Sequence, residues 1–172
     1  IEKREGLVVS RIQMGKTQKD LVGIHFHGQT NWTEEENYVF NSMIKVLNIQ
    51  LREALREDKG GVYGVGVNGG FSQRPKNAYG INIQFNTEPK RVDELIKTVY
   101  ENIDSLKNNL VSEEKIIKVK ETQRREREMD LKENDFWLNV LQYYDEYGKD
   151  IQLLFDYDKQ IDGLTAQKIK DA

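Results

Sequence analysis

A long amphipathic segment, 31–58, constrains the fold most, because its apolar side chains recur at the spacing of one helical face. Thr33 and Glu36 lie three residues apart at its start, where each side chain can satisfy a free backbone N–H of the first turn. Gly60 and Gly61 follow its end, and glycine tolerates the left-handed conformation that is common beyond helix ends. The expected apolar stripe consists of Phe40, Met43, Ile44, Leu47, Leu51, Ala54 and Leu55.

Two segments after this helix alternate apolar with small or polar residues, which is the pattern of half-buried strands. They are 62–71 and 78–86, and the polar segment 72–77 between them supplies a turn. Two more strand-like segments, 6–14 and 19–28, open the chain and are expected to form a hairpin around a turn at 15–17. Glycines inside a strand, at Gly64, Gly66 and Gly70, indicate that another backbone or a helix comes very close there.

The rest of the chain is expected to be helical. Pro89 opens a second amphipathic helix that ends near Asn108, since proline is tolerated in a first turn. Ser112 and Thr165 are expected to cap later helices, and Gly148 to end one. The resulting order is β-β-α-β-β-α followed by a helical C-terminal tail. This order predicts one α+β domain over residues 1–172, a sandwich of helices on an antiparallel or mixed sheet.

Composition excludes several classes of function. The 172 residues include no cysteine, so neither a disulfide framework nor a thiolate zinc site is possible. The net charge of -3, from 26 basic and 29 acidic residues, argues against nucleic acid as a partner. The segment 120–130 interleaves acids and bases, so we interpret it as a solvated helix face. No apolar run approaches the ~20 residues needed for a membrane span.

Arg56 and Tyr63 are the candidate binding residues. They stand at the end of the long helix and the start of the next strand, so both are expected near one edge of the sheet. The N–H donors of arginine and the phenol of tyrosine can together hold a peptide carbonyl, a carboxylate or a developing oxyanion. The alternative is structural, with Arg56 on a solvated helix end and Tyr63 in the core.

Two other groups of side chains invite a functional interpretation. His25 and His27 are the only histidines, and on a strand they share one face, a geometry that can chelate a metal. No third ligand is indicated, so a structural or surface role is favoured and no metal site is predicted in this chain. The aromatic residues of segment 136–147 are interpreted as part of the core or of a domain contact.

The segment 47–67, LNIQLREALREDKGGVYGVGV, resembles the C-terminal half of the pitrilysin and insulinase family of zinc peptidases. The stretches SEEKIIKVK, ENDFW and IDGLTAQKI extend the resemblance over most of the chain. It implies that Arg56 and Tyr63 hold a peptide substrate opposite a zinc ion bound by another domain, whose inverted HxxEH motif supplies ligands. This chain contains no such motif, so no residue of it is predicted to be catalytic and alone it is expected to be inactive.

The resemblance also implies partners. The zinc-bearing half of a zinc metalloendopeptidase would lie either in the same, longer chain or in a partner subunit. The cellular location that the resemblance implies is a bacterial envelope or periplasm. The chain ends inside a predicted helix, whereas domains of that family usually finish with a strand, so it is expected to be a truncated piece. One alternative is a non-catalytic scaffold of the same family, in which Arg56 and Tyr63 are incidental. Another is an independent binding module, which the charge balance does not favour.

Overall fold

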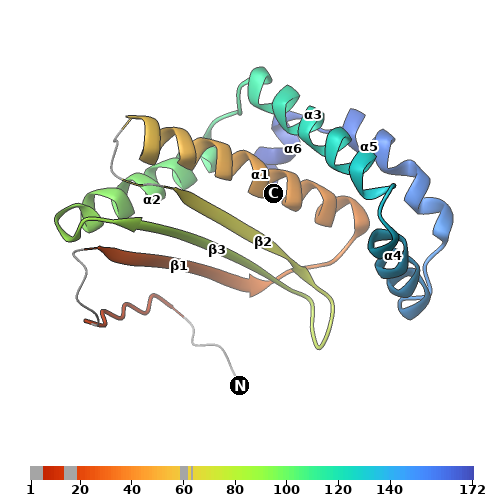
Figure 1. The fold of residues 1–172 in the computed structure, drawn as a ribbon, viewed down its shortest axis with the longest axis horizontal. Coiled ribbons are helices and arrows are strands. Elements are labelled where there is room, and N and C mark those ends of the chain that lie inside the picture. The colour runs from red at the N-terminus through yellow and green to blue at the C-terminus, as the bar shows by residue number, and fades with distance from the viewer. Residues whose placement is uncertain (1–5, 14–18, 59–61, 63) are drawn as a thin grey trace.

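The computed structural model describes residues 6–13, 19–58, 62 and 64–172, which form a sheet covered by helices (Figure 1). The strands are β1 (Asp20–Gln29), β2 (Val65–Ser72) and β3 (Ala78–Thr87). Helix α1 (Glu34–Arg52) continues into a π-helical turn, Glu53–Asp58, and a short 3₁₀ turn at Pro89–Arg91 leads into α2 (Val92–Asn108). The later helices are α3 (Glu113–Asp130), α4 (Asn134–Glu146), α5 (Tyr157–Asp162) and α6 (Ala166–Asp171), with a 3₁₀ segment at Ile151–Asp156.

The sheet is antiparallel, with β3 in the centre and the order β1-β3-β2. Ile83 of β3 lies opposite Ile24 of β1 on one side and Val67 of β2 on the other. This arrangement confirms the α+β class and fixes the sheet as antiparallel. In the described part of the chain, the strands β1, β2 and β3 make up the whole sheet, so the order is β-α-β-β-α rather than the expected β-β-α-β-β-α.

The prediction of an N-terminal hairpin is wrong for residues 6–13, the described part of its first strand. Residues 6–13 contain no strand, and β1 pairs with β3 instead. Leu7, Val8 and Val9 are apolar at successive positions, so the segment has no single face to bury, and these side chains are 54–84% exposed. An exposed ion pair of 2.9 Å joins Arg11 to Asp93 at the start of α2. The expected turn at 15–17 lies outside the described residues.

The helices cover one face of the sheet, and the hydrophobic core lies between the helices and that face. Figure 1 shows α1 and α2 along this face, with α3, α5 and α6 on the other side of α1. Val22, Ile83 and Phe85 point into this core from the sheet, because they share one face by the two-residue period of strands. Leu51 and Val99 meet them from α1 and α2, and both side chains are fully buried. The opposite face of the sheet carries no helix of the described chain.

The close approach expected at glycine occurs at Gly69 and not at the three glycines expected from the sequence. A Cβ atom at Gly69 would lie 2.7 Å from Cδ1 of Ile44 in α1 and 2.8 Å from the carbonyl oxygen of Gly80. No atom would lie within 4 Å of a Cβ at Gly64 or Gly66, and at Gly70 the nearest would be 4.0 Å away. Gly69 shares the helix-facing side of β2 with Val65 and Val67, so it is the glycine that lets α1 pack onto the sheet.

Candidate functional site

Arg56 lies on the π-helical turn that ends the α1 segment, and its side chain is exposed. No ion pair or hydrogen bond joins its guanidinium to another residue of the described chain. The turn is fixed by Leu55, which is fully buried in the core next to it. A π-helix is rare and is frequently found at functional sites. Arg56 is therefore a solvent-facing cation on a well-anchored backbone.

Tyr63 lies outside the described residues, as do Gly60 and Gly61, so the relation between Tyr63 and Arg56 stays a prediction. The flanking residues are placed. Val62 is buried, and β2 begins at Val65 next to β3.

An ion pair joins this turn to α3. Lys115 Nζ lies 2.7 Å from a carboxylate oxygen of Glu53, with side-chain exposures of 25% and 38%. Lys115 is in the first turn of α3, whose N-terminal cap position is Ser112, although the Ser112 side chain makes no capping hydrogen bond. The sequence offered no signal for this contact, because the two residues lie far apart in the chain.

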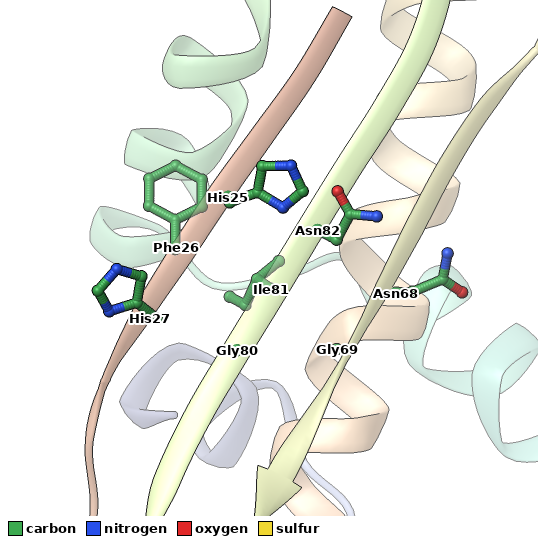
Figure 2. A pocket seen from close by; sticks show the side chains of 8 residues that line it. All are labelled: His25, Phe26, His27, Asn68, Gly69, Gly80, Ile81 and Asn82. Atoms are coloured by element: carbon green, nitrogen blue, oxygen red, sulfur yellow. The ribbon is translucent and has the colours of Figure 1, made fainter. Parts of the chain in front are cut away.

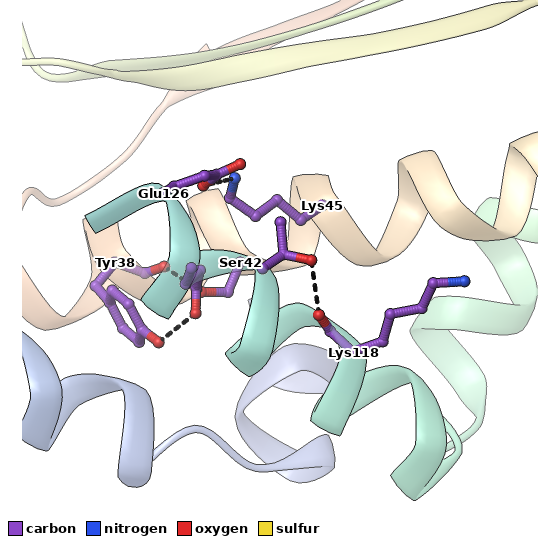
Figure 3. A network of polar contacts seen from close by, with 7 residues as sticks. Tyr38, Ser42, Lys45, Lys118 and Glu126 are labelled. Atoms are coloured by element: carbon purple, nitrogen blue, oxygen red, sulfur yellow. Dashed lines mark hydrogen bonds and ion pairs between the residues drawn. The ribbon is translucent and has the colours of Figure 1, made fainter. Parts of the chain in front are cut away.

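Polar contacts elsewhere along the same interface hold α1 against α3 (Figure 3). The Tyr38 hydroxyl donates to Gln123 Oε1 at 2.8 Å, and Gln123 Nε2 donates to Ser42 Oγ at 2.8 Å. Lys45 and Glu126 form an ion pair of 2.6 Å nearby. Gln123 and Ser42 are almost fully buried, so each of these hydrogen bonds replaces water that the side chain lost on folding. These contacts join α3 to the helix that leads into the turn carrying Arg56.

His25 and His27 share the open face of β1, as expected, but their geometry does not favour chelation. The His25 ring folds back along the strand, because its Nε2 lies 3.4 Å from where a Cβ of Gly23 would be. Figure 2 shows the two rings pointing to opposite sides of the strand. Among the described residues, no group of three or more histidines or carboxylates is placed to hold a metal.

The open face of the sheet forms a shallow hollow of about 460 Å³ in which these histidines lie (Figure 2). Asn82 stands opposite His25 and Asn68 across the strands, and its buried Oδ1 atom has no hydrogen-bond partner in the described chain. Gly80 shares this face with Asn82 and has no side chain, so the wall there is backbone. No acidic, lysine or arginine side chain lines the hollow, so the imidazoles of His25 and His27 are the only groups in its lining suited to acid-base chemistry.

A second polar cluster surrounds Lys149 near the start of α1. Its ammonium group pairs with Glu34 at the start of α1, donates to the Tyr143 hydroxyl at 2.6 Å, and lies 3.7 Å from the ring centre of Trp32. Burial acts to lower the pKa of Lys149, but the hydrogen bonds to Glu34 and Tyr143 outweigh it and raise the pKa. Tyr143 and its neighbours in the aromatic segment are half-buried, and Tyr143 takes part in this contact between α4 and α1.

Replacing Lys149 with methionine is expected to lower the free energy of unfolding by about 1 to 2 kcal/mol at pH 7, because the ion pair and the cation-π contact are lost together. A raised pKa in the folded state means that the lysine stabilises the fold below its unfolded pKa of about 10.4 and loses that effect as the pH rises through the raised value. Denaturant unfolding at pH 7 and pH 11.5 measures this. Lys118→Met, on an exposed lysine of α3, is the control. An equal difference at both pH values would contradict the prediction.

The geometry defines the class of domain to which the chain belongs. It is an α+β domain with helices on one face of an antiparallel sheet, an exposed arginine on an anchored turn, and no metal-binding group in its described residues. Residues 1–123 match the family model described as the peptidase M16 inactive domain. The chain therefore belongs to the M16 or pitrilysin family, as the resemblance of segment 47–67 predicts.

Individual relatives agree with this assignment. The chain is 31% identical over 96 residues to a probable zinc protease PqqL of Haemophilus influenzae, covering 54% of this chain and 10% of that protein. It superposes on the periplasmic protease PqqL from Escherichia coli with a TM-score of 0.75 at 16% identity, covering 90% of this chain and 17% of that one. A peptidase M16 inactive domain from Pseudomonas fluorescens gives a TM-score of 0.74 at 18% identity, covering 90% and 37%. These structures share the fold.

The chain thus spans about a tenth of the length of the curated relative that it matches. It represents a non-catalytic domain type of a family that contains zinc proteases. Within the described residues, no helix is both long and apolar enough to cross a bilayer.

Proposed function

We propose that this chain is the substrate-holding domain of a zinc metalloendopeptidase and that Arg56 and Tyr63 bind the peptide. The observation that carries the proposal is the state of Arg56. Its guanidinium is exposed and has no partner in the described chain, and the turn that carries it is anchored by Leu55. The guanidinium can therefore bind a ligand without first breaking another contact. The family of the chain makes a peptide the ligand to expect.

The residues that the structure describes do not fit zinc, since the two histidine rings point apart and no third ligand stands near them. The zinc ion of the proposed enzyme therefore belongs to another domain, in the same chain or in a partner subunit, and residues 1–172 form a single domain that brings no catalytic group. The related zinc protease of Haemophilus influenzae supports a zinc enzyme as the whole.

The proposed task of Arg56 and Tyr63 is to bind and orient. The guanidinium donates hydrogen bonds to a carbonyl oxygen of the substrate backbone, and the phenol donates a second one. Both bonds strengthen when negative charge develops on that oxygen, because a charge-assisted hydrogen bond is about twice as strong as a neutral one. A donor in such a position typically contributes about 2 to 4 kcal/mol to transition-state stabilisation.

The test is hydrolysis of a pool of quenched peptides by the zinc-loaded full-length protein, with Arg56 or Tyr63 replaced. The proposal expects a large loss of activity at unchanged zinc content and unchanged folding. Full activity in both variants would instead identify the domain as a non-catalytic scaffold.

A further inference from the structure

The ion pair between Glu53 and Lys115 lies one turn before Arg56. The negatively charged Glu53 is therefore a competitor for the positively charged guanidinium of Arg56. Glu53 precedes Arg56 by three residues on the same helical segment. On the π-helical turn these two residues do not share one face as they would on an α-helix, but the side chains of glutamate and arginine are long enough to meet across three residues. In the structure, Glu53 is paired with Lys115 of α3 instead.

We propose that Lys115 is a positioning residue, which keeps the carboxylate of Glu53 away from Arg56 and so leaves the guanidinium available to the substrate. The inference rests on the proposed function of Arg56. Lys115 itself makes no contact with the substrate.

Three features of the structure support this role. The pair is half-buried, with exposures of 25% for Lys115 and 38% for Glu53, so solvent screens it less than an ordinary surface pair. It joins two helices that are already locked together by the buried hydrogen bonds of Tyr38, Ser42 and Gln123, so the ammonium is held near Glu53. The guanidinium of Arg56 has no partner in the described chain, which is the state expected when the nearby carboxylate is occupied.

Removing the ammonium would release the carboxylate. Glu53 could then turn toward Arg56, neutralise its charge and compete with the substrate carbonyl for its N–H donors. The loss would fall mainly on binding, because the competing pair must be broken each time a peptide is bound. Removing the carboxylate together with the ammonium would eliminate the competitor, and binding would recover.

The experiment is a double-mutant cycle in the full-length protein. The variants are Lys115→Met, Glu53→Gln and the two combined, with Lys118→Met as the matched control on an exposed lysine of the same helix. The measurements are the Kd of a fluorescent peptide for the zinc-stripped protein and kcat and KM of the zinc-loaded protein. Thermal unfolding of each variant separates binding from folding.

We expect Lys115→Met to weaken peptide binding and raise KM by roughly fivefold with little change in kcat, and the double variant to return close to the parent value, since neighbouring charges couple non-additively. Unchanged binding in Lys115→Met would overturn the inference. Weakened binding that the double variant does not restore would also overturn it, because a merely structural pair gives that result.

Arg56→Ala, measured in parallel, separates the two levels of the account. If Arg56→Ala weakens binding and Lys115→Met does not, only the role of Lys115 fails. If Arg56→Ala has no effect, the proposed function of Arg56 fails and the inference fails with it.

Discussion

Arg56→Ala is expected to lower kcat/KM for peptide hydrolysis by about a hundredfold in the zinc-loaded full-length protein, because one charge-assisted donor to the reacting carbonyl is worth about 2.7 kcal/mol or more. Tyr63→Phe removes a single hydroxyl and is expected to lower kcat/KM by at least about tenfold. Both variants should bind zinc and unfold like the parent, since the Arg56 side chain is exposed and phenylalanine preserves the ring of Tyr63.

The control is Arg52→Ala, which removes the same side chain from the exposed last residue of α1, one turn earlier. It should keep the parent rate. If Arg52→Ala and Arg56→Ala lose activity equally, a general effect of positive charge explains the loss, and the specific role of Arg56 is contradicted.

Gly69→Val is expected to destabilise the fold by at least about 3 kcal/mol, the upper range for overpacking a core. The Cβ alone would lie 2.7 Å from Ile44 of α1 and 2.8 Å from the backbone oxygen of Gly80. The Cδ1 atom of Ile44 can rotate away at a cost in packing, but the backbone oxygen of Gly80 in the central strand cannot retreat without disturbing the sheet. Denaturant unfolding followed by circular dichroism measures the change.

Gly66→Val is the matched control, because it lies on the same strand with nothing within 4 Å of its Cβ position. Valine favours strands, so this variant is expected to be neutral or to stabilise the fold by up to about 1 kcal/mol. Equal destabilisation by the two substitutions would show that α1 does not pack against Gly69 as described.

Local signals predicted the helix boundaries well because they act over one turn of chain. The Glu36 N–H donates to Thr33 Oγ1 at 3.1 Å and the Lys168 N–H to Thr165 Oγ1 at 3.2 Å, so these two expected caps are confirmed, whereas Ser112 stands at the cap position of α3 without a side-chain hydrogen bond. Glu36 itself accepts from the Thr33 hydroxyl at 2.9 Å, rather than from the backbone N–H expected of a capping box. Gly148 ends α4 with a φ of 61°, which glycine adopts without strain.

The sheet was harder to predict because its partners are distant in the sequence. The alternation in 19–28 and 78–86 identified β1 and β3 but could not show that they pair with each other. The composition of segment 6–13 is typical of a strand, yet these residues form no strand in the structure. Choosing Gly69 among the glycines of β2 likewise required knowing which face α1 covers.

In the candidate site too, the sequence indicated individual residues but not the contacts between distant parts of the chain. Its residues, Arg56 and Tyr63, came from a resemblance in one short segment, and the exposed position of Arg56 agrees with a binding role. The pairing of Glu53 with Lys115 comes from the packing of the α1 segment against α3, and the π-helical turn that carries Glu53 and Arg56 was likewise not predicted. No local pattern encodes them, because the pair spans two helices that are separated by the whole of the β2–β3 hairpin and α2.

The most direct test of the central claim is to ask where a bound peptide touches this domain. A substrate-like peptide with a photoreactive group beside its scissile bond is bound to the full-length protein, irradiated, and its attachment sites are mapped by mass spectrometry. We expect attachment within residues 53–65, abolished by excess unlabelled peptide and reduced by Arg56→Ala. Specific attachment elsewhere in the protein, with none in this segment, would contradict it.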